Sequence, residues 1–199
     1  MRNGKGPSGI IKTICVYCGS GKGRNPKYAR AAQTLGKAMA QSGIGLVYGG
    51  GGLGLMGEVA RSVLSHGGHV TGIIPTFLSE KEQMLKDVNE LILTKDMHER
   101  KRLMFERSDA FVALPGGIGT LEELIEQLTW SQLGLHNKPI VALDVGGFFS
   151  PLRVLVDHAV DEGFVREAHR DQLRIASDVR EALLMLQEPP RPNVSKWSK

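Results

Sequence analysis

The segment PGGIGTLEE, residues 115–123, combines the residue types of a phosphate site with those of an acid–base centre. It follows an apolar run, residues 109–114, which is typical of a buried parallel strand, and it leads into a helical pattern with leucines on one face. Gly116, Gly117 and Gly119 therefore lie where a strand turns into a helix. Glycines at such a turn let the backbone approach a ligand, and the N–H groups of the helix start bind phosphate.

Two carboxylates, Glu122 and Glu123, follow this turn directly. A site that only holds phosphate has no need of them, whereas a site that holds a sugar phosphate and reacts at the sugar can use one. A structural alternative exists for Glu123. Thr120-Leu-Glu-Glu123 also fits a T-x-x-E capping box, in which Glu123 would only bond back to the Thr120 N–H. The sequence leaves both interpretations open.

A second charged segment, DMHERK, is predicted to open another helix at Asp96, with Glu99 in the position of a capping box. Arg100 shares a helix face with Met97 and Met104, so it is expected to point toward the protein body. A cation on an inward face needs an anionic partner. A structural salt bridge and a ligand-binding or catalytic role are the two alternatives for Arg100.

The elements that must position these groups alternate along the chain. Strands are expected at residues 13–17, 45–48, 70–74, 90–94, 110–114, 140–144 and 173–176. Helices are expected at residues 26–41, 55–65, 97–108, 121–133, 152–162 and 178–186. This alternation predicts a single Rossmann-like domain over residues 10–187, a doubly wound parallel sheet with helices on both faces. Residues 1–9 and 188–199 are interpreted as flexible tails.

Glycine-rich loops are expected at the carboxyl ends of three strands, where sheets of this class bind ligands. They cover residues 18–21, 49–57 and 115–119. The second loop contains G-x-G-x-x-G, but it follows the second strand and no acid ends the next one, so a nucleotide-contacting loop is predicted rather than an NAD site. Ser20 and Gly50 are candidate substrate contacts in these loops.

The charge distribution argues against a nucleic-acid-binding protein. The net charge is +4 and the pI is about 9.1. Residues 1–12 hold three basic and no acidic side chains, and residues 188–199 hold three basic and one acidic, so residues 13–187 sum to −1. A basic surface on the fold itself is therefore not expected. No apolar run approaches the roughly 20 residues that span a bilayer, and the N-terminus lacks a signal-peptide core, so a cytoplasmic protein is predicted.

The two cysteines, Cys15 and Cys18, form a C-x-x-C motif. Cys15 lies within an expected strand, where a spacing of three residues directs the two side chains to opposite faces. We therefore predict free thiols rather than a redox pair, and no metal site.

These residues together resemble the LONELY GUY (LOG) family, the cytokinin riboside 5′-monophosphate phosphoribohydrolases, many of which carry the label lysine decarboxylase. The family signature P-G-G-x-G-T-x-x-E, preceded by M-H-x-R-K, reads PGGIGTLEE and MHERK here. The segments VYCGS, VYGGGGLGLMG and LTWSQLGLHNKPI extend the resemblance over most of the chain. Gly21 is a departure, because members often have a second serine after CGS.

The resemblance implies hydrolysis of the N-glycosidic bond of an adenosine 5′-monophosphate, with or without an N6 substituent, to free base and ribose 5-phosphate. It implies no cofactor and no metal. The implied catalytic pair is Arg100 and Glu123. The implied substrate-binding residues are Gly116, Gly117, Gly119, Thr120, Lys101, Glu122 and Glu82.

The family also implies at least a homodimer, with contacts from the helices predicted at residues 97–108 and 121–133. Two competing functions remain at this point: a non-catalytic nucleotide or molybdenum-cofactor carrier on the same fold, and a lysine decarboxylase. The second would need pyridoxal phosphate on a Schiff-base lysine.

Overall fold

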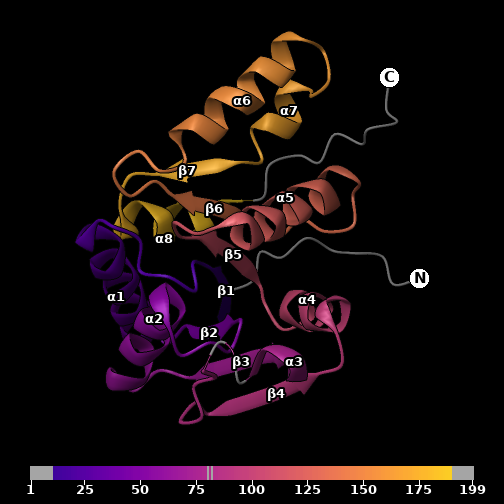
Figure 1. Cartoon of the computed structure of the whole chain (residues 1–199). Coiled ribbons are helices and arrows are strands. Elements are labelled where there is room, and N and C mark those ends of the chain that lie inside the picture. Colours follow the sequence, from indigo (N-terminus) through magenta and orange to yellow (C-terminus); the bar gives the residue numbers. More distant parts are fainter. Residues whose placement is uncertain (1–10, 80, 82, 190–199) are drawn as a thin grey trace.

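The computed structural model describes residues 11–79, 81 and 83–189. Within them, seven parallel strands form one sheet in the order β4-β3-β2-β1-β5-β6-β7 (Figure 1). The strands are β1 (Thr13–Tyr17), β2 (Gly45–Tyr48), β3 (Val70–Pro75), β4 (Glu90–Thr94), β5 (Ala110–Ala113), β6 (Ile140–Leu143) and β7 (Arg174–Ala176). The predicted doubly wound α/β fold is confirmed.

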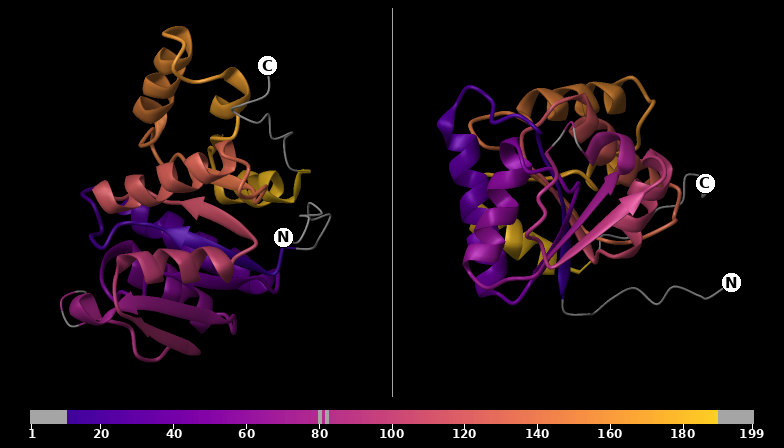
Figure 2. Two further views of the ribbon diagram at one scale, coloured as in Figure 1. Left: turned by 90° about the vertical axis from the view of Figure 1, so that its right-hand side faces the viewer. Right: turned by 60° about the horizontal axis from the view of Figure 1, so that its bottom comes forward.

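Helices cover both faces of the sheet (Figure 2). They are α1 (Pro26–Gln41), α2 (Gly54–Ser65), α3 (Thr76–Ser79), α4 (Met97–Glu106), α5 (Ile118–Gln132), α6 (Ser150–Asp161), α7 (Glu167–Arg170) and α8 (Val179–Gln187). One core cluster joins α1, α2 and α8 to the sheet, and a second joins α4 and α5 to the opposite face. None of these described helices is long and apolar enough to cross a bilayer.

The strand order reverses beside β1, which pairs with β2 on one side and β5 on the other. The chain runs outward to β4 before it returns to β5, so the loops that leave the carboxyl ends of β1 and β5 diverge to opposite faces. Such a switch point is where open parallel sheets bind ligands. Before they diverge, the two loops start side by side, where the Gly19 N–H donates to the Pro115 carbonyl at 3.1 Å, at the predicted location.

The structure corrects one boundary that matters for the site. Helix α5 was expected to begin at Leu121, but it begins at Ile118, with Gly117 as the N-cap residue and no side-chain cap. The glycine at position 119, a weak helix former, makes the first turn resemble a loop in the sequence. The short helices α3 and α7 were not predicted, because four residues do not reveal a helical period.

The expected start of α4 is confirmed in detail. The Asp96 side chain accepts a hydrogen bond from the Glu99 N–H at 2.8 Å. The Glu99 carboxylate in turn accepts the Lys95 N–H at 2.8 Å, one residue before the position of a standard capping box. This cap fixes where α4 begins and so where Arg100 leaves it.

The two cysteines lie on opposite faces of the sheet, as predicted. Cys15 belongs to the core that contains α4 and α5, whereas Cys18 belongs to the core that contains α1 and α2, and both are free thiols. The C-x-x-C motif is therefore not arranged as a redox pair.

His136, in the segment that follows α5, is buried. The His136 ring packs against Phe105 and Phe111, with ring centroids 5.3 and 5.8 Å away. Its Nδ1 accepts the Lys138 N–H at 3.1 Å, so the proton of the neutral ring is on Nε2, which donates to the Gln127 carbonyl at 3.1 Å. Burial lowers the pKa of His136 from its ordinary 6.5 to about 4.

This pKa predicts an acid-sensitive fold. The ring is neutral in the folded state and takes up a proton on unfolding, so its contribution to folding stability is complete above pH 6.5 and is lost as the pH falls toward 4. Lowering the pH from 7 to 4 should therefore reduce the free energy of unfolding by about 3 kcal/mol through His136 alone. Urea denaturation at both pH values should find this extra loss in the wild-type protein and not in His136→Gln. Equal losses in the two proteins would refute this role of His136.

Candidate active site

A cavity of about 270 Å³ opens at the switch point, slightly below the range of roughly 300–1,000 Å³ typical of small-molecule sites. Four segments line it: the end of β1 with its loop, the β2–α2 segment, the first turns of α4 and the start of α5. The residues are Val16, Tyr17, Cys18, Gly19, Ser20, Gly49, Met56, Met97, Arg100, Met104, Gly117, Ile118, Gly119, Thr120, Glu122 and Glu123.

The first turn of α5 contributes to the lining of this cavity. Its first N–H groups have no acceptor within the helix, and no side chain caps them. Gly117, Gly119 and Thr120 line the cavity from this turn. The partial positive charge of the helix N-terminus adds to the unpaired N–H donors, so a phosphate group fits here.

The G-x-G-x-x-G loop is used differently. The N–H groups of Leu55 and Met56, at the start of α2, donate to the Gly19 carbonyl at 2.9 and 3.3 Å. A Cβ on Gly54, whose φ is +56°, would run into the backbone of Ser20. This helix start is therefore occupied by the chain itself, which argues against the pyrophosphate site of an NAD-binding protein, whereas the predicted nucleotide contact of this loop stays a prediction.

Arg100 is buried on the cavity wall, with 6% of its surface exposed. Its guanidinium donates to the Gly49 carbonyl at 3.3 Å and to the Met97 sulfur at 3.6 Å. A Cβ on Gly49 would collide with this guanidinium, so only glycine permits the contact. The buried Nε has no hydrogen-bond partner within the described part of the chain. Because both acceptors are neutral, the buried positive charge of Arg100 is suited to bind an anionic ligand.

Glu123 lies on the same cavity wall and is 8% exposed. The capping-box interpretation of Glu123 is wrong, because Thr120 lies inside the first turn of α5 and is not its N-cap residue. Burial raises the pKa of the Cys18 thiol, the Glu123 charge raises it further, and the Arg100 charge lowers it. The thiol in the cavity is therefore protonated at neutral pH and is not a nucleophile.

A matching model of the protein family described as "possible lysine decarboxylase" covers residues 56–186. The chain is 50% identical over 178 residues to the cytokinin riboside 5′-monophosphate phosphoribohydrolase LOG of Oryza sativa subsp. japonica, covering 89% of this chain and 74% of the relative. It is 45% identical to the phosphoribohydrolase of the same name from Rhodococcoides fascians, covering 89% and 90% of the two chains. The chain belongs to the LOG family.

LOG proteins share their fold with a second group of solved structures. The molybdenum cofactor binding protein of Rippkaea orientalis superposes with a TM-score of 0.66 at 23% identity, covering 90% of this chain and 98% of the other. A Moco carrier protein from Chlamydomonas reinhardtii has a TM-score of 0.66 at 24% identity, with 88% and 94% covered. At this identity the similarity supports the fold alone.

The structure brings most of the LOG signature residues to one cavity. Arg100, Glu123 and the predicted contacts Ser20, Gly117, Gly119, Thr120 and Glu122 all line it. Gly116 lies next to it, where a Cβ would overlap the Thr120 side chain. Gly50 has a φ of +76° and its carbonyl accepts the Leu85 N–H at 3.0 Å, which supports the loop. Glu82 lies outside the described residues.

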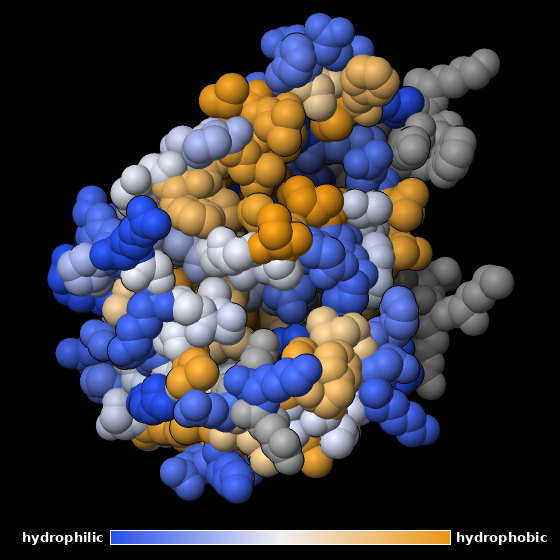
Figure 3. Space-filling model, in the orientation of Figure 1, coloured by the Kyte–Doolittle hydropathy of each residue, from blue (hydrophilic) through white to orange (hydrophobic). Residues whose placement is uncertain are grey.

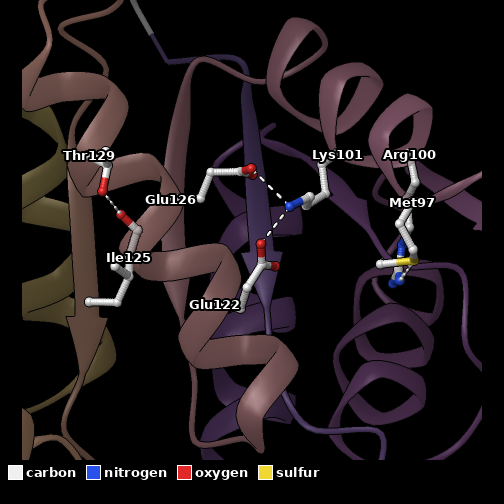
Figure 4. A network of polar contacts seen from close by, with 7 residues as sticks. All are labelled: Met97, Arg100, Lys101, Glu122, Ile125, Glu126 and Thr129. Atoms are coloured by element: carbon white, nitrogen blue, oxygen red, sulfur yellow. Dashed lines mark hydrogen bonds and ion pairs between the residues drawn. The ribbon is translucent and has the colours of Figure 1, made fainter.

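Lys101 is part of an ionic network between two helices (Figure 4). Its ammonium donates to Glu122 at 2.5 Å and to Glu126 at 2.8 Å. Burial lowers the pKa of Lys101, but the two carboxylates outweigh this effect, so its pKa is raised and the ammonium is charged at neutral pH. Glu126 was not singled out in the sequence. Its position one helical turn after Glu122 was the available signal.

Proposed function

We propose that this LOG protein hydrolyses the N-glycosidic bond of adenosine 5′-monophosphates, including N6-substituted ones, to free base and ribose 5-phosphate. The proposal rests chiefly on one observation. Buried Arg100 and Glu123 face one cavity, and the uncapped start of α5 lies at the same cavity. A carboxylate, a guanidinium and a helix start suited to phosphate, all at one cavity, suit chemistry on a sugar phosphate.

The proposed reaction assigns one role to each group. The start of α5 and Thr120 bind the 5′-phosphate, which fixes the ribose in the cavity. Cleavage of the bond between base and sugar builds positive charge on the ribose ring, as in other glycoside hydrolyses. Glu123 stabilises that charge and orients or deprotonates the attacking water. Arg100 keeps Glu123 ionised and orients it with the substrate.

A lysine decarboxylase, the activity named by the family model, fits this cavity poorly. Its pyridoxal phosphate would need a lysine amine in the site to form a Schiff base. No lysine lines the cavity among the residues that the structure describes, and Lys101 already binds Glu122 and Glu126. A non-catalytic carrier on this fold would have no need of both Arg100 and Glu123.

Chromatography of the products tests the proposal. The purified protein is incubated with AMP and with isopentenyladenosine 5′-monophosphate, and the corresponding nucleosides serve as controls. We expect free base from the monophosphates and none from the nucleosides, because only the former carry the group that α5 binds. Release of base from nucleosides at the same rate would contradict the role of α5. The ratio of the two monophosphate rates identifies the preferred base.

The proposed assembly is a homodimer formed through α5 and α6. Helix α6 is amphipathic, yet none of its residues is buried, and Val154 and Leu155 are 68% and 62% exposed. Ile118 and Ile125 of α5 are also exposed, and Figure 3 shows hydrophobic side chains gathered over these two helices. An apolar surface of this kind is typical of a protein interface. The sequence-based expectation had assigned the contacts to α4 and α5.

Charged residues on α6 should therefore separate the subunits. The double variant Val154→Glu/Leu155→Glu is expected to sediment as a monomer in analytical ultracentrifugation where the wild-type protein sediments as a dimer. Leu184→Glu is the matched control, because Leu184 is 55% exposed on α8, on the opposite face of the sheet. A monomeric wild-type protein, or a dimer that only Leu184→Glu disrupts, would exclude this interface.

A cytoplasmic location remains a prediction from the sequence.

A further inference from the structure

The two proposed catalytic side chains lie on different helices, and the backbones of these helices pack on different strands. Arg100 belongs to α4, which packs on β3 and β4, whereas Glu123 belongs to α5, which packs on β1. The distance between the two side chains therefore depends on how α4 is held against α5. A displacement of about 1 Å between reacting groups can cost about 10²-fold in rate.

Besides the apolar core that both helices share, an aromatic contact and an ionic contact link α4 to α5 among the described residues. Near their carboxyl ends, Phe105 of α4 packs edge-on against Trp130 of α5, with ring centroids 5.2 Å apart. Nearer the cavity, Lys101 of α4 bonds to Glu122 and Glu126 of α5 (Figure 4). The aromatic contact lies at the far ends of the two helices, and the ionic contact is the polar link nearer the cavity.

The ionic contact is adjacent to both catalytic residues in the chain. Lys101 follows Arg100, and Glu122 precedes Glu123. Figure 4 shows Lys101 extending toward α5 while Arg100 leaves α4 on another side, next to Met97. Any shift of Lys101 relative to Glu122 therefore moves Arg100 relative to Glu123, because each is the direct chain neighbour of one of them.

We propose that Lys101, Glu122 and Glu126 form a clamp that sets the separation of Arg100 and Glu123, with Lys101 and Glu126 as positioning residues. The proposal rests on the proposed function, since it concerns the rate of that reaction. Glu126 does not line the cavity within the described residues, whereas Glu122 does. Glu126 is therefore not placed to touch a substrate in the cavity, and its ion pair with Lys101 is its link to α4.

Burial and charge favour a positioning role over a purely stabilising one. The side chains of Lys101 and Glu126 are 14% and 20% exposed, so their contact is only weakly screened by solvent. The second Glu126 oxygen, Oε2, is buried with no hydrogen-bond partner in the described part of the chain. An unsatisfied buried oxygen is costly, so an apolar side chain would serve stability better. Lys101 also offsets the repulsion between two carboxylates one turn apart.

The variant Glu126→Met tests the clamp, with Glu106→Met, at an exposed glutamate of α4, as the matched control. We expect kcat of Glu126→Met to fall about 10- to 100-fold, while KM changes less than about threefold because the cavity lining is intact. The acid limb of the kcat–pH profile should move to higher pH, since a displaced Arg100 no longer favours the ionised Glu123. A change in folding stability alone would not move that limb.

Four further variants sharpen the test. In a double-mutant cycle, Lys101→Met/Glu126→Met should be no slower than Lys101→Met alone, because both changes break one clamp. Lys101→Arg should retain most of the activity, since a guanidinium can donate to both carboxylates. If Glu126→Met fails to fold, Glu126→Gln keeps the shape and should still reduce kcat.

The outcomes separate the clamp from the proposed function. Wild-type kcat and an unmoved pH profile in a folded Glu126→Met would overturn the clamp and leave the proposed function standing. A raised KM in Lys101→Met with no effect of Glu126→Met would also overturn it, in favour of direct contact between Lys101 and substrate. Absence of base release by the wild-type protein would overturn the proposed function and the clamp with it.

Discussion

Replacing Glu123 by glutamine is expected to lower kcat by about 10²–10⁴-fold, the range for loss of a general base or a charge-stabilising group. Glutamine keeps the size of the side chain but carries no negative charge to oppose the charge that develops on the ribose ring. Glu123 is buried on the cavity wall, and the N-cap residue of α5 is Gly117, so an isosteric glutamine removes the charge and keeps the helix start. Steady-state kinetics on a nucleoside 5′-monophosphate measures the effect.

A glutamate outside the cavity provides the control for this variant. Glu106→Gln makes the same change at an exposed position of α4. It should retain wild-type activity. Nucleotide binding measured by calorimetry should persist in both variants, because the start of α5 is unchanged. Full activity of a folded Glu123→Gln would exclude Glu123 as the reactive carboxylate.

Replacing Arg100 by alanine is expected to lower kcat by about 10²-fold or more, the scale for loss of one electrostatic contact in the transition state. Arg100 is the buried cation of the cavity wall and its two acceptors, the Gly49 carbonyl and the Met97 sulfur, are neutral. Its loss removes the positive charge that Arg100 contributes to the cavity wall shared with Glu123, so the acid limb of the pH profile should move to higher pH as well.

A kinetic split distinguishes this role from simple substrate binding. If Arg100→Ala kept its full kcat and only raised KM, Arg100 would bind the ground state and transition state equally and would not orient Glu123. Arg102→Met is the matched control, because Arg102 is an exposed cation two residues later on the same helix. That variant should retain wild-type kinetics.

Local pattern was sufficient to predict the fold and the site region. The alternation of elements gave the parallel sheet, and the Asp96 cap placed the start of α4 at the residue observed. The inward direction of Arg100 followed from its spacing to Met97 and Met104, and its burial confirms it. These features depend on neighbours a few residues away in the chain, which a single sequence reveals.

The remaining features depend on contacts between distant segments. The start of α5 was misplaced because Gly119 weakens the helical pattern where tertiary structure imposes a helix. The Gly49 carbonyl accepts from a residue 51 positions away, and Lys101 meets Glu126 across 25 positions. No local spacing relates such residues, so the sequence could not show that Arg100 is held by Gly49 or that Glu126 faces α4.

Simultaneous measurement of both products tests the central claim most directly. The protein is incubated with isopentenyladenosine 5′-monophosphate in a buffer free of inorganic phosphate and pyrophosphate, so that water is the only acceptor for the sugar. Hydrolysis at the N-glycosidic bond predicts free base and ribose 5-phosphate in equal amounts at all times, and neither product from the nucleoside. Tight binding of the nucleotide by calorimetry with neither product formed would contradict the account and favour a nucleotide carrier.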